Sequence, residues 1–158
     1  MKRKMSIGRI AIMALLAAGS LGSLTLVTSS ATFAAQPGRP CSVAVLEGDW
    51  GVSVGGTRVA GPGVTEAFAG VALRTYDGGG GFIEVASSHG QVTGVATPTL
   101  SGTYTVNPDC TGTARFVPPG APVAVESAFV IVDRGDEIRE VVLRPLPNLV
   151  TAVQRRVH

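Results

Sequence analysis

The sequence contains little of what most catalytic and metal sites are built from. Its 158 residues include only two histidines and two cysteines. His89 lies in a polar turn and His158 ends the chain, and neither stands at a metal-ligand spacing from another donor. No Ser-His-Asp or Cys-His set can be assembled. These absences argue against a zinc or haem site, against any bound cofactor and against nucleophilic catalysis.

Lysine is scarce and occurs only at the start of the chain. A basic segment at Lys2–Lys4 precedes the uncharged, apolar stretch Ile10–Val27 and the small, polar segment Thr28–Ala35. This order is typical of a secretory signal peptide. We expect residues 1–34 to be removed by cleavage after Ala34, and the product to be secreted or periplasmic. Cleavage after Ala31 and an uncleaved membrane anchor are the alternatives.

Removal of that segment would change the charge of the protein. The signal peptide contains Lys2, Arg3, Lys4 and Arg9, so nine of the thirteen basic residues remain, all arginine, against eleven acidic residues. The formal charge therefore falls from +2 to −2. A slightly acidic domain without lysine is a poor candidate for binding a phosphate backbone. We expect no nucleic-acid partner and no stable membrane insertion after cleavage, and the oligomeric state stays open.

The two cysteines are expected to form a structural disulfide. Residues 35–44 form a short Pro/Gly leader that contains Cys41, and residues 45–158 are long enough for one domain with one core. Cys110 follows an Asn-Pro-Asp turn. In an oxidising compartment such a pair is typical of a disulfide. The alternative, a reactive or metal-binding thiol pair, lacks neighbouring histidines.

The remaining pattern is that of consecutive β-hairpins. Short runs rich in Val, Thr and aromatic residues alternate with Gly, Pro, Asn and Asp clusters, and no helical stripe of useful length occurs. Eight antiparallel strands have exposed edges unless the sheet closes. We therefore predict an all-β fold, an eight-stranded antiparallel up-and-down β-barrel, with a β-sandwich as the alternative. The expected strands are Val43–Val54, Glu66–Tyr76, Gly81–Ser88, Leu100–Val106, Thr111–Val117, Val123–Asp133, Asp136–Arg144 and Leu149–Arg155.

Three motifs carry a family resemblance that extends from about Val45 to Arg155. They are Gly48-Asp49-Trp50, Asp77 with the glycine run at 78–81, and the segment 101–113, which contains Tyr104. Together they resemble small secreted proteins of the allene oxide cyclase barrel-like and lipocalin-like group. The resemblance implies an antiparallel barrel whose floor is closed by Trp50, packed on Arg155 or Arg156. It carries over no catalytic residue, and Trp50 and Tyr104 are expected to be structural.

The hairpin that joins the sixth and seventh expected strands assigns residues to the two faces of the sheet. If Arg134-Gly135 is its loop, alternation places one mainly apolar set of side chains on the same face. The opposite face carries Glu126, Glu137 and Arg139 and is expected to be outside. Glu140 then points inward, paired with Arg144 or Arg115. The predicted lumen residues are Val125, Phe129, Ile131, Ile138, Glu140, Val142 and Arg144.

These expectations leave three functional classes. An eight-stranded barrel has a lumen that side chains can just fill or that holds one small ligand. The first hypothesis is a module that binds a small apolar molecule in its lumen. The second is an envelope or extracellular interaction protein with a filled barrel. The third is a cyclase or isomerase that confines an apolar substrate, and it ranks last because no catalytic constellation stands out.

Overall fold

The computed structural model describes residues 40–158. The predicted signal peptide, most of the leader and the predicted cleavage site lie outside the described residues. The described part contains two short 3-10 helices and nine strands, and none of its helices is long and apolar enough to cross a membrane. The elements are η1 (Val43–Leu46), β1 (Gly48–Gly61), β2 (Val64–Tyr76), β3 (Gly81–Gly90), β4 (Gly94–Ala96), β5 (Thr99–Val106), β6 (Thr111–Phe116), β7 (Val125–Val132), η2 (Asp133–Gly135), β8 (Glu137–Arg144) and β9 (Leu149–Arg156).

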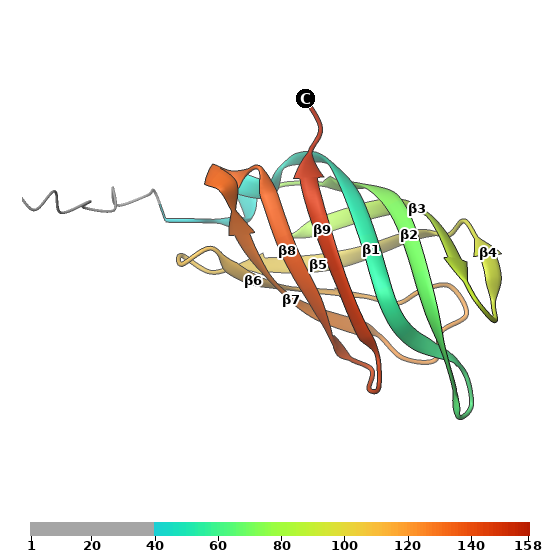
Figure 1. Ribbon diagram of the computed structural model, residues 1–158. Coiled ribbons are helices and arrows are strands. Elements are labelled where there is room, and N and C mark those ends of the chain that lie inside the picture. The colour runs from blue at the N-terminus through green and yellow to red at the C-terminus, as the bar shows by residue number, and fades with distance from the viewer. Residues whose placement is uncertain (1–39) are drawn as a thin grey trace, which may run out of the picture. The chain divides into compact units, whose positions relative to one another are not determined.

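Eight of the strands form a closed ring (Figure 1). Their order is β2-β1-β9-β8-β7-β6-β5-β3, every pairing is antiparallel, and β2 pairs with β3 to complete the circle. The short β4 lies outside the ring and pairs only with β3. The predicted up-and-down barrel is therefore confirmed, and the ring excludes the alternative sandwich.

Several expected strand boundaries differ from the structure, and one strand was not predicted. A strand was predicted from residue 43, but Val43–Leu46 forms η1 and β1 starts only at Gly48. The 3-10 turn carries Leu46 into the core, where it is fully buried. The strand β4 was not predicted, because its three residues carry too short a pattern to stand out from the turn before it.

The β7–β8 hairpin has the predicted register over most of its length. Ile131 pairs with Ile138 and Phe129 with Glu140, so these side chains share the inner face. A bulge then shifts the register, because Ser127 pairs with Val142 while Glu126 pairs with Arg144. The extra residue reverses the alternation on the bulged strand. The expectation that Arg144 faces the lumen is wrong: Arg144 is exposed on the outside.

One end of the barrel is closed by aromatic residues. Trp50 is fully buried, and its indole N–H donates a hydrogen bond to the Leu46 carbonyl at 2.8 Å. Tyr76 packs edge-on against Trp50 and Tyr104, with ring centroids 6.2 and 4.8 Å apart. Arg156, at the end of β9, places its guanidinium 4.5 Å from the Trp50 ring centroid. Burial and aromatic packing therefore seal this end.

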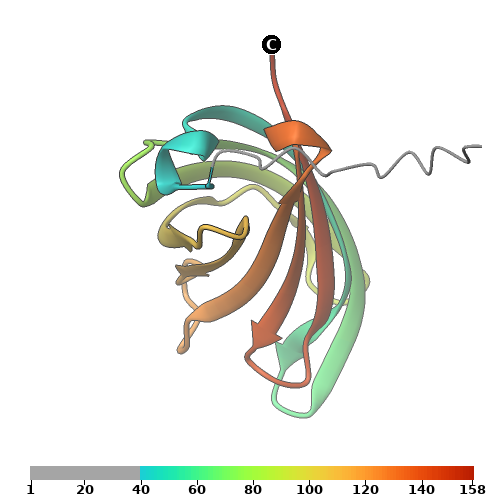
Figure 2. The same cartoon turned by 90° about the vertical axis from the view of Figure 1, so that its left-hand side faces the viewer.

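The disulfide attaches the chain segment before β1, which covers the closed end of the barrel. Cys41 is bonded to Cys110, as predicted, and the Cys41 N–H donates to the Pro108 carbonyl at 3.2 Å. The hydroxyl of Tyr104 donates to the Val43 carbonyl at 3.0 Å. Figure 2 shows η1 at the end of the barrel opposite the β1–β2 and β8–β9 hairpins. The chain before β1 is thus held across one mouth of the barrel.

Candidate functional site

The other end of the barrel contains a cavity of about 570 Å³. It extends from Arg74 inside the ring to the loops that join β6 to β7 and β8 to β9, which place Pro118, Pro122 and Leu146 at its rim. A volume of this size is in the range of small-molecule sites. The wall is mainly aliphatic, and its strand residues include Val52, Val54, Ala86, Leu100, Val125, Val142, Val150 and Ala152.

The cavity exists because inward-facing side chains become small toward the open end. On β3, the inward series runs from Phe82 through Glu84 to Ala86 and Ser88. On β9 it runs from Gln154 through Ala152 to Val150. An eight-stranded barrel is just wide enough for large side chains to fill. Where alanine and valine point inward instead, space remains.

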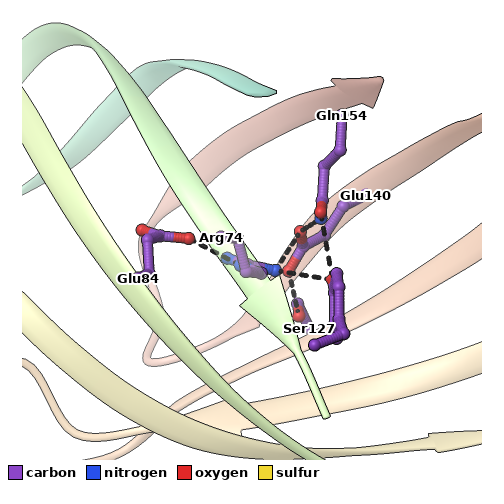
Figure 3. A network of polar contacts seen from close by, with 6 residues as sticks. Arg74, Glu84, Ser127, Glu140 and Gln154 are labelled. Atoms are coloured by element: carbon purple, nitrogen blue, oxygen red, sulfur yellow. Dashed lines mark hydrogen bonds and ion pairs between the residues drawn. The ribbon is translucent and has the colours of Figure 1, made fainter. Parts of the chain in front are cut away.

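A buried arginine forms the floor of the cavity (Figure 3). Arg74, on β2, is only 4% exposed. Its Nε donates to Oε2 of Glu84 at 2.6 Å, and its Nη1 donates to Oε2 of Glu140 at 3.2 Å. The guanidinium also lies 4.5 Å from the Phe82 ring centroid, so it rests on the aromatic closed end. Arg74 therefore joins two carboxylates from opposite sides of the barrel.

Glu140 is fixed by further donors at the same floor. The Ser127 hydroxyl donates to its Oε1 at 2.5 Å, and the Gln154 amide donates to its Oε2 at 2.6 Å. The Tyr76 hydroxyl in turn donates to Oε1 of Gln154 at 3.0 Å. A buried carboxylate is tolerated only when it is paired and hydrogen-bonded in this way. Glu140 is therefore a well-anchored member of the floor.

The electrostatics of the floor keep the arginine charged. Burial acts to lower the pKa of Arg74, but the charge of Glu140 and smaller contributions from Tyr76 and Glu84 outweigh it and raise that pKa. Burial raises the pKa of the Tyr76 hydroxyl, so Tyr76 stays a neutral donor. The floor thus combines one guanidinium with two carboxyl groups beneath an aliphatic chamber.

Another buried carboxylate, separate from the two at the floor, lies near the mouth. Glu66, on β2, accepts hydrogen bonds from Arg58 Nε at 2.8 Å and from the Thr93 hydroxyl and N–H at 2.7 and 2.9 Å. Its carboxylate occupies the space that a side chain at Gly90 would take. Burial acts to raise the pKa of Glu66, but these bonds and the one from the Val92 N–H lower it to about 2. Arg58, which lines the cavity, is therefore already neutralised.

The predicted lumen residues divide between three places. Val125, Glu140 and Val142 line the cavity. Phe129, Ile131 and Ile138 point inward but belong to the packed core of the closed end. Arg144 lies outside, and Arg115, also considered as a partner of Glu140, is exposed beside Glu126 at 3.6 Å.

Sequence reasoning missed Arg74 and Glu84, the groups that hold Glu140 and face the cavity. The β2 segment around Arg74 has apolar residues on both faces, since Val71 and Leu73 are exposed while Ala72 and Tyr76 are not. Alternation therefore gives no direction for Arg74. The weak signal available was the arginine itself, in a strand otherwise poor in charge.

The polar groups of this site can form ion pairs and hydrogen bonds. Across residues 40–158, no three His, Cys, Asp or Glu side chains gather where a metal ion could be held. Within the same range both cysteines are used in the disulfide. The arrangement can thus orient a guest through Arg74 and Glu84 while its aliphatic wall buries the remainder.

Comparisons with known proteins were made at the level of sequence and of structure. The sequence matches no protein-family model and no curated protein. The crystal structure of Rv2717c from M. tuberculosis is similar to this chain, with a TM-score of 0.38 and 16% sequence identity, over 72% of this chain and 94% of that one. Membership of the lipocalin-like or allene oxide cyclase-like group therefore stays a prediction.

Proposed function

We propose that this protein is an exported binding module that holds a small, mainly apolar molecule inside its barrel. The observation that carries the proposal is the cavity of about 570 Å³, with an aliphatic wall, a polar floor and a mouth among the loops. Sites for small ligands combine these features: apolar surface supplies affinity, and a few fixed polar groups supply orientation. A barrel with a filled lumen, as the interaction-protein hypothesis requires, would not retain such a space.

Export is the part of the proposal that rests on sequence. The basic, apolar and small-residue order of residues 1–34 supports a signal peptide, and the Cys41–Cys110 disulfide fits an oxidising compartment. Intact-mass measurement on protein recovered from the periplasm or medium should find a chain that starts near Ala35. Recovery of the full chain from these compartments would contradict the cleavage.

The binding proposal is tested with an uncharged apolar fluorophore. N-phenylnaphthylamine should bind purified protein saturably, with increased emission, because it can enter the aliphatic chamber. Ala86→Phe should weaken that binding at least about tenfold, since the new ring occupies the space beside the floor.

Val85→Phe is the matched control for this substitution. Val85 is the preceding residue on the same strand and is 57% exposed on the outer face. The variant adds the same kind of ring outside the barrel and should leave binding unchanged. Absence of saturable binding to the wild-type protein, or equal effects of the two variants, would reject the proposal.

A further inference from the structure

The floor of the cavity carries one donor and one acceptor that the protein leaves without a partner. Among residues 40–158, the hydrogen bonds of Arg74 use Nε and Nη1, and the one bond of the Glu84 carboxylate uses Oε2. In this part of the chain, every side-chain nitrogen or oxygen that is fully buried has a hydrogen-bond partner. Since Arg74 Nη2 and Glu84 Oε1 have none, these two atoms are not fully buried and can be reached by solvent or a guest. Both residues line the cavity.

Glu84 is the more informative of the two. Glu84 is only 8% exposed, yet one of its two carboxylate oxygens, Oε1, accepts no hydrogen bond from the protein. Figure 3 shows this second oxygen turned away from Arg74. Glu140, in contrast, accepts bonds from Ser127, Gln154 and Arg74. The free oxygen of a carboxylate on so buried a residue is expected to accept a hydrogen bond from whatever occupies the cavity.

The charge of the floor argues against an acidic guest. One guanidinium faces two carboxylates, and Arg74 is bonded to both, at 2.6 and 3.2 Å. The other cation on the wall, Arg58, is paired with Glu66 at 2.8 Å. A carboxylate placed at the floor would meet Glu84 without a free counter-charge, and like charges repel strongly where solvent is excluded.

We propose that the guest carries an uncharged head group that both accepts and donates a hydrogen bond, such as a primary amide or a hydroxyl. The inference rests on the binding function proposed above and identifies its ligand class. The head group accepts from Nη2 of Arg74 and donates to Oε1 of Glu84, while its apolar body lies along the aliphatic wall. An ammonium group can only donate a hydrogen bond, so it would pair with Glu84 alone. A carboxylate can only accept, so it would pair with Arg74 alone.

Displacement of N-phenylnaphthylamine by three matched compounds tests the head group. Decanamide donates and accepts, methyl decanoate only accepts, and decanoate is an anion, while the chain is of similar length in all three. Used below their aggregation concentrations, decanamide should displace the fluorophore best. Methyl decanoate should be weaker by about tenfold, as expected for loss of a hydrogen bond to a charged group. Decanoate should be weakest.

The outcomes separate this inference from the function on which it rests. If the fluorophore binds but decanoate displaces it as well as decanamide does, the head-group inference is overturned and the binding module stands. If the fluorophore does not bind, the proposed function itself fails. The wild-type protein alone decides between these results, whether or not any variant folds.

A variant of the floor sharpens the result. Glu84→Gln removes one negative charge and keeps the shape, so the disadvantage of decanoate relative to decanamide should shrink about tenfold. Glu126→Gln is the matched control, because Glu126 lies on the outer face with its side chain 51% exposed. It should leave the order of the three compounds unchanged. Equal behaviour of the two variants would overturn the role given to Glu84.

Discussion

The two ends of the barrel are made from the same strands and differ in the size of the side chains that face inward. At the closed end, Trp50, Tyr76 and Tyr104 fill the ring and η1 covers them. At the open end, β3 and β9 contribute Ala86 and Ala152, and a cavity remains. Side-chain volume along each strand therefore decides where an eight-stranded barrel is a core and where it is a container.

Arg74 lies at the boundary between these two regions. One side of its guanidinium contacts the Phe82 ring of the closed end, and Glu84 and Glu140 bind it at the cavity floor. The polar floor is thus held by the rigid end and presented to the hollow one. Substitutions at the two ends should consequently separate stability from binding.

The largest effect on stability is expected from Trp50→Ala. Loss of a fully buried tryptophan should lower the free energy of unfolding by about 3–5 kcal/mol, because it removes apolar burial and leaves a void. The comparison is Val142→Ala, which removes a half-buried wall residue of the cavity and should cost about 1 kcal/mol. Urea unfolding followed by far-ultraviolet circular dichroism measures both. Similar costs at the two positions would contradict the contrast between the ends.

The next effect concerns the disulfide. Replacing both Cys41 and Cys110 by serine should lower the free energy of unfolding by about 2–4 kcal/mol, because the bond closes a loop with a sequence separation of 69. The bond lies at the closed end, so the folded variant should still bind N-phenylnaphthylamine. Loss of that binding at a temperature where the variant is folded would show that the two ends are coupled.

The smallest effect is a pH dependence at the open end. The pKa of Glu66 is lowered in the folded protein to about 2 from an ordinary 4.5, so its stabilising contribution is present above about pH 4.5 and is lost as the pH falls toward about 2. The melting temperatures of wild-type protein and Glu66→Gln should differ most at neutral pH and converge in acid. Thr65→Ala, an exposed neighbour, is the control, and a gap that stays constant with pH would refute the assignment.

The fold followed from local patterns, which is why most of it was predictable. Runs of β-branched and aromatic residues between Gly, Pro and Asp turns place the strands, and hairpin pairing needs only neighbouring segments. The β7–β8 register shows this, since Phe129 and Glu140 face each other as expected. The bulge opposite Glu126 was not predictable, because one extra residue leaves no mark on the composition.

The floor of the cavity depends on contacts between distant segments. Arg74 and Glu140 are separated by 66 positions and meet only once the ring has closed. Glu140 was predicted to point inward and need a cation, but the cations considered were Arg144 and Arg115, and both lie outside. Alternation within a strand predicts the face of the sheet on which a side chain lies, but not the residue that it contacts on the opposite wall of the barrel. The need for a partner was foreseeable, and its identity was not.

The position of Trp50 gives this protein an intrinsic fluorescence signal that reports on unfolding. It is the single tryptophan of the chain, it is fully buried at the sealed end, and Arg156 lies against its ring. Its emission should be blue-shifted in the native state and should move to longer wavelength when the barrel opens. The cavity wall does not include it. Intrinsic fluorescence will therefore follow unfolding of the chain while remaining insensitive to an optically silent guest.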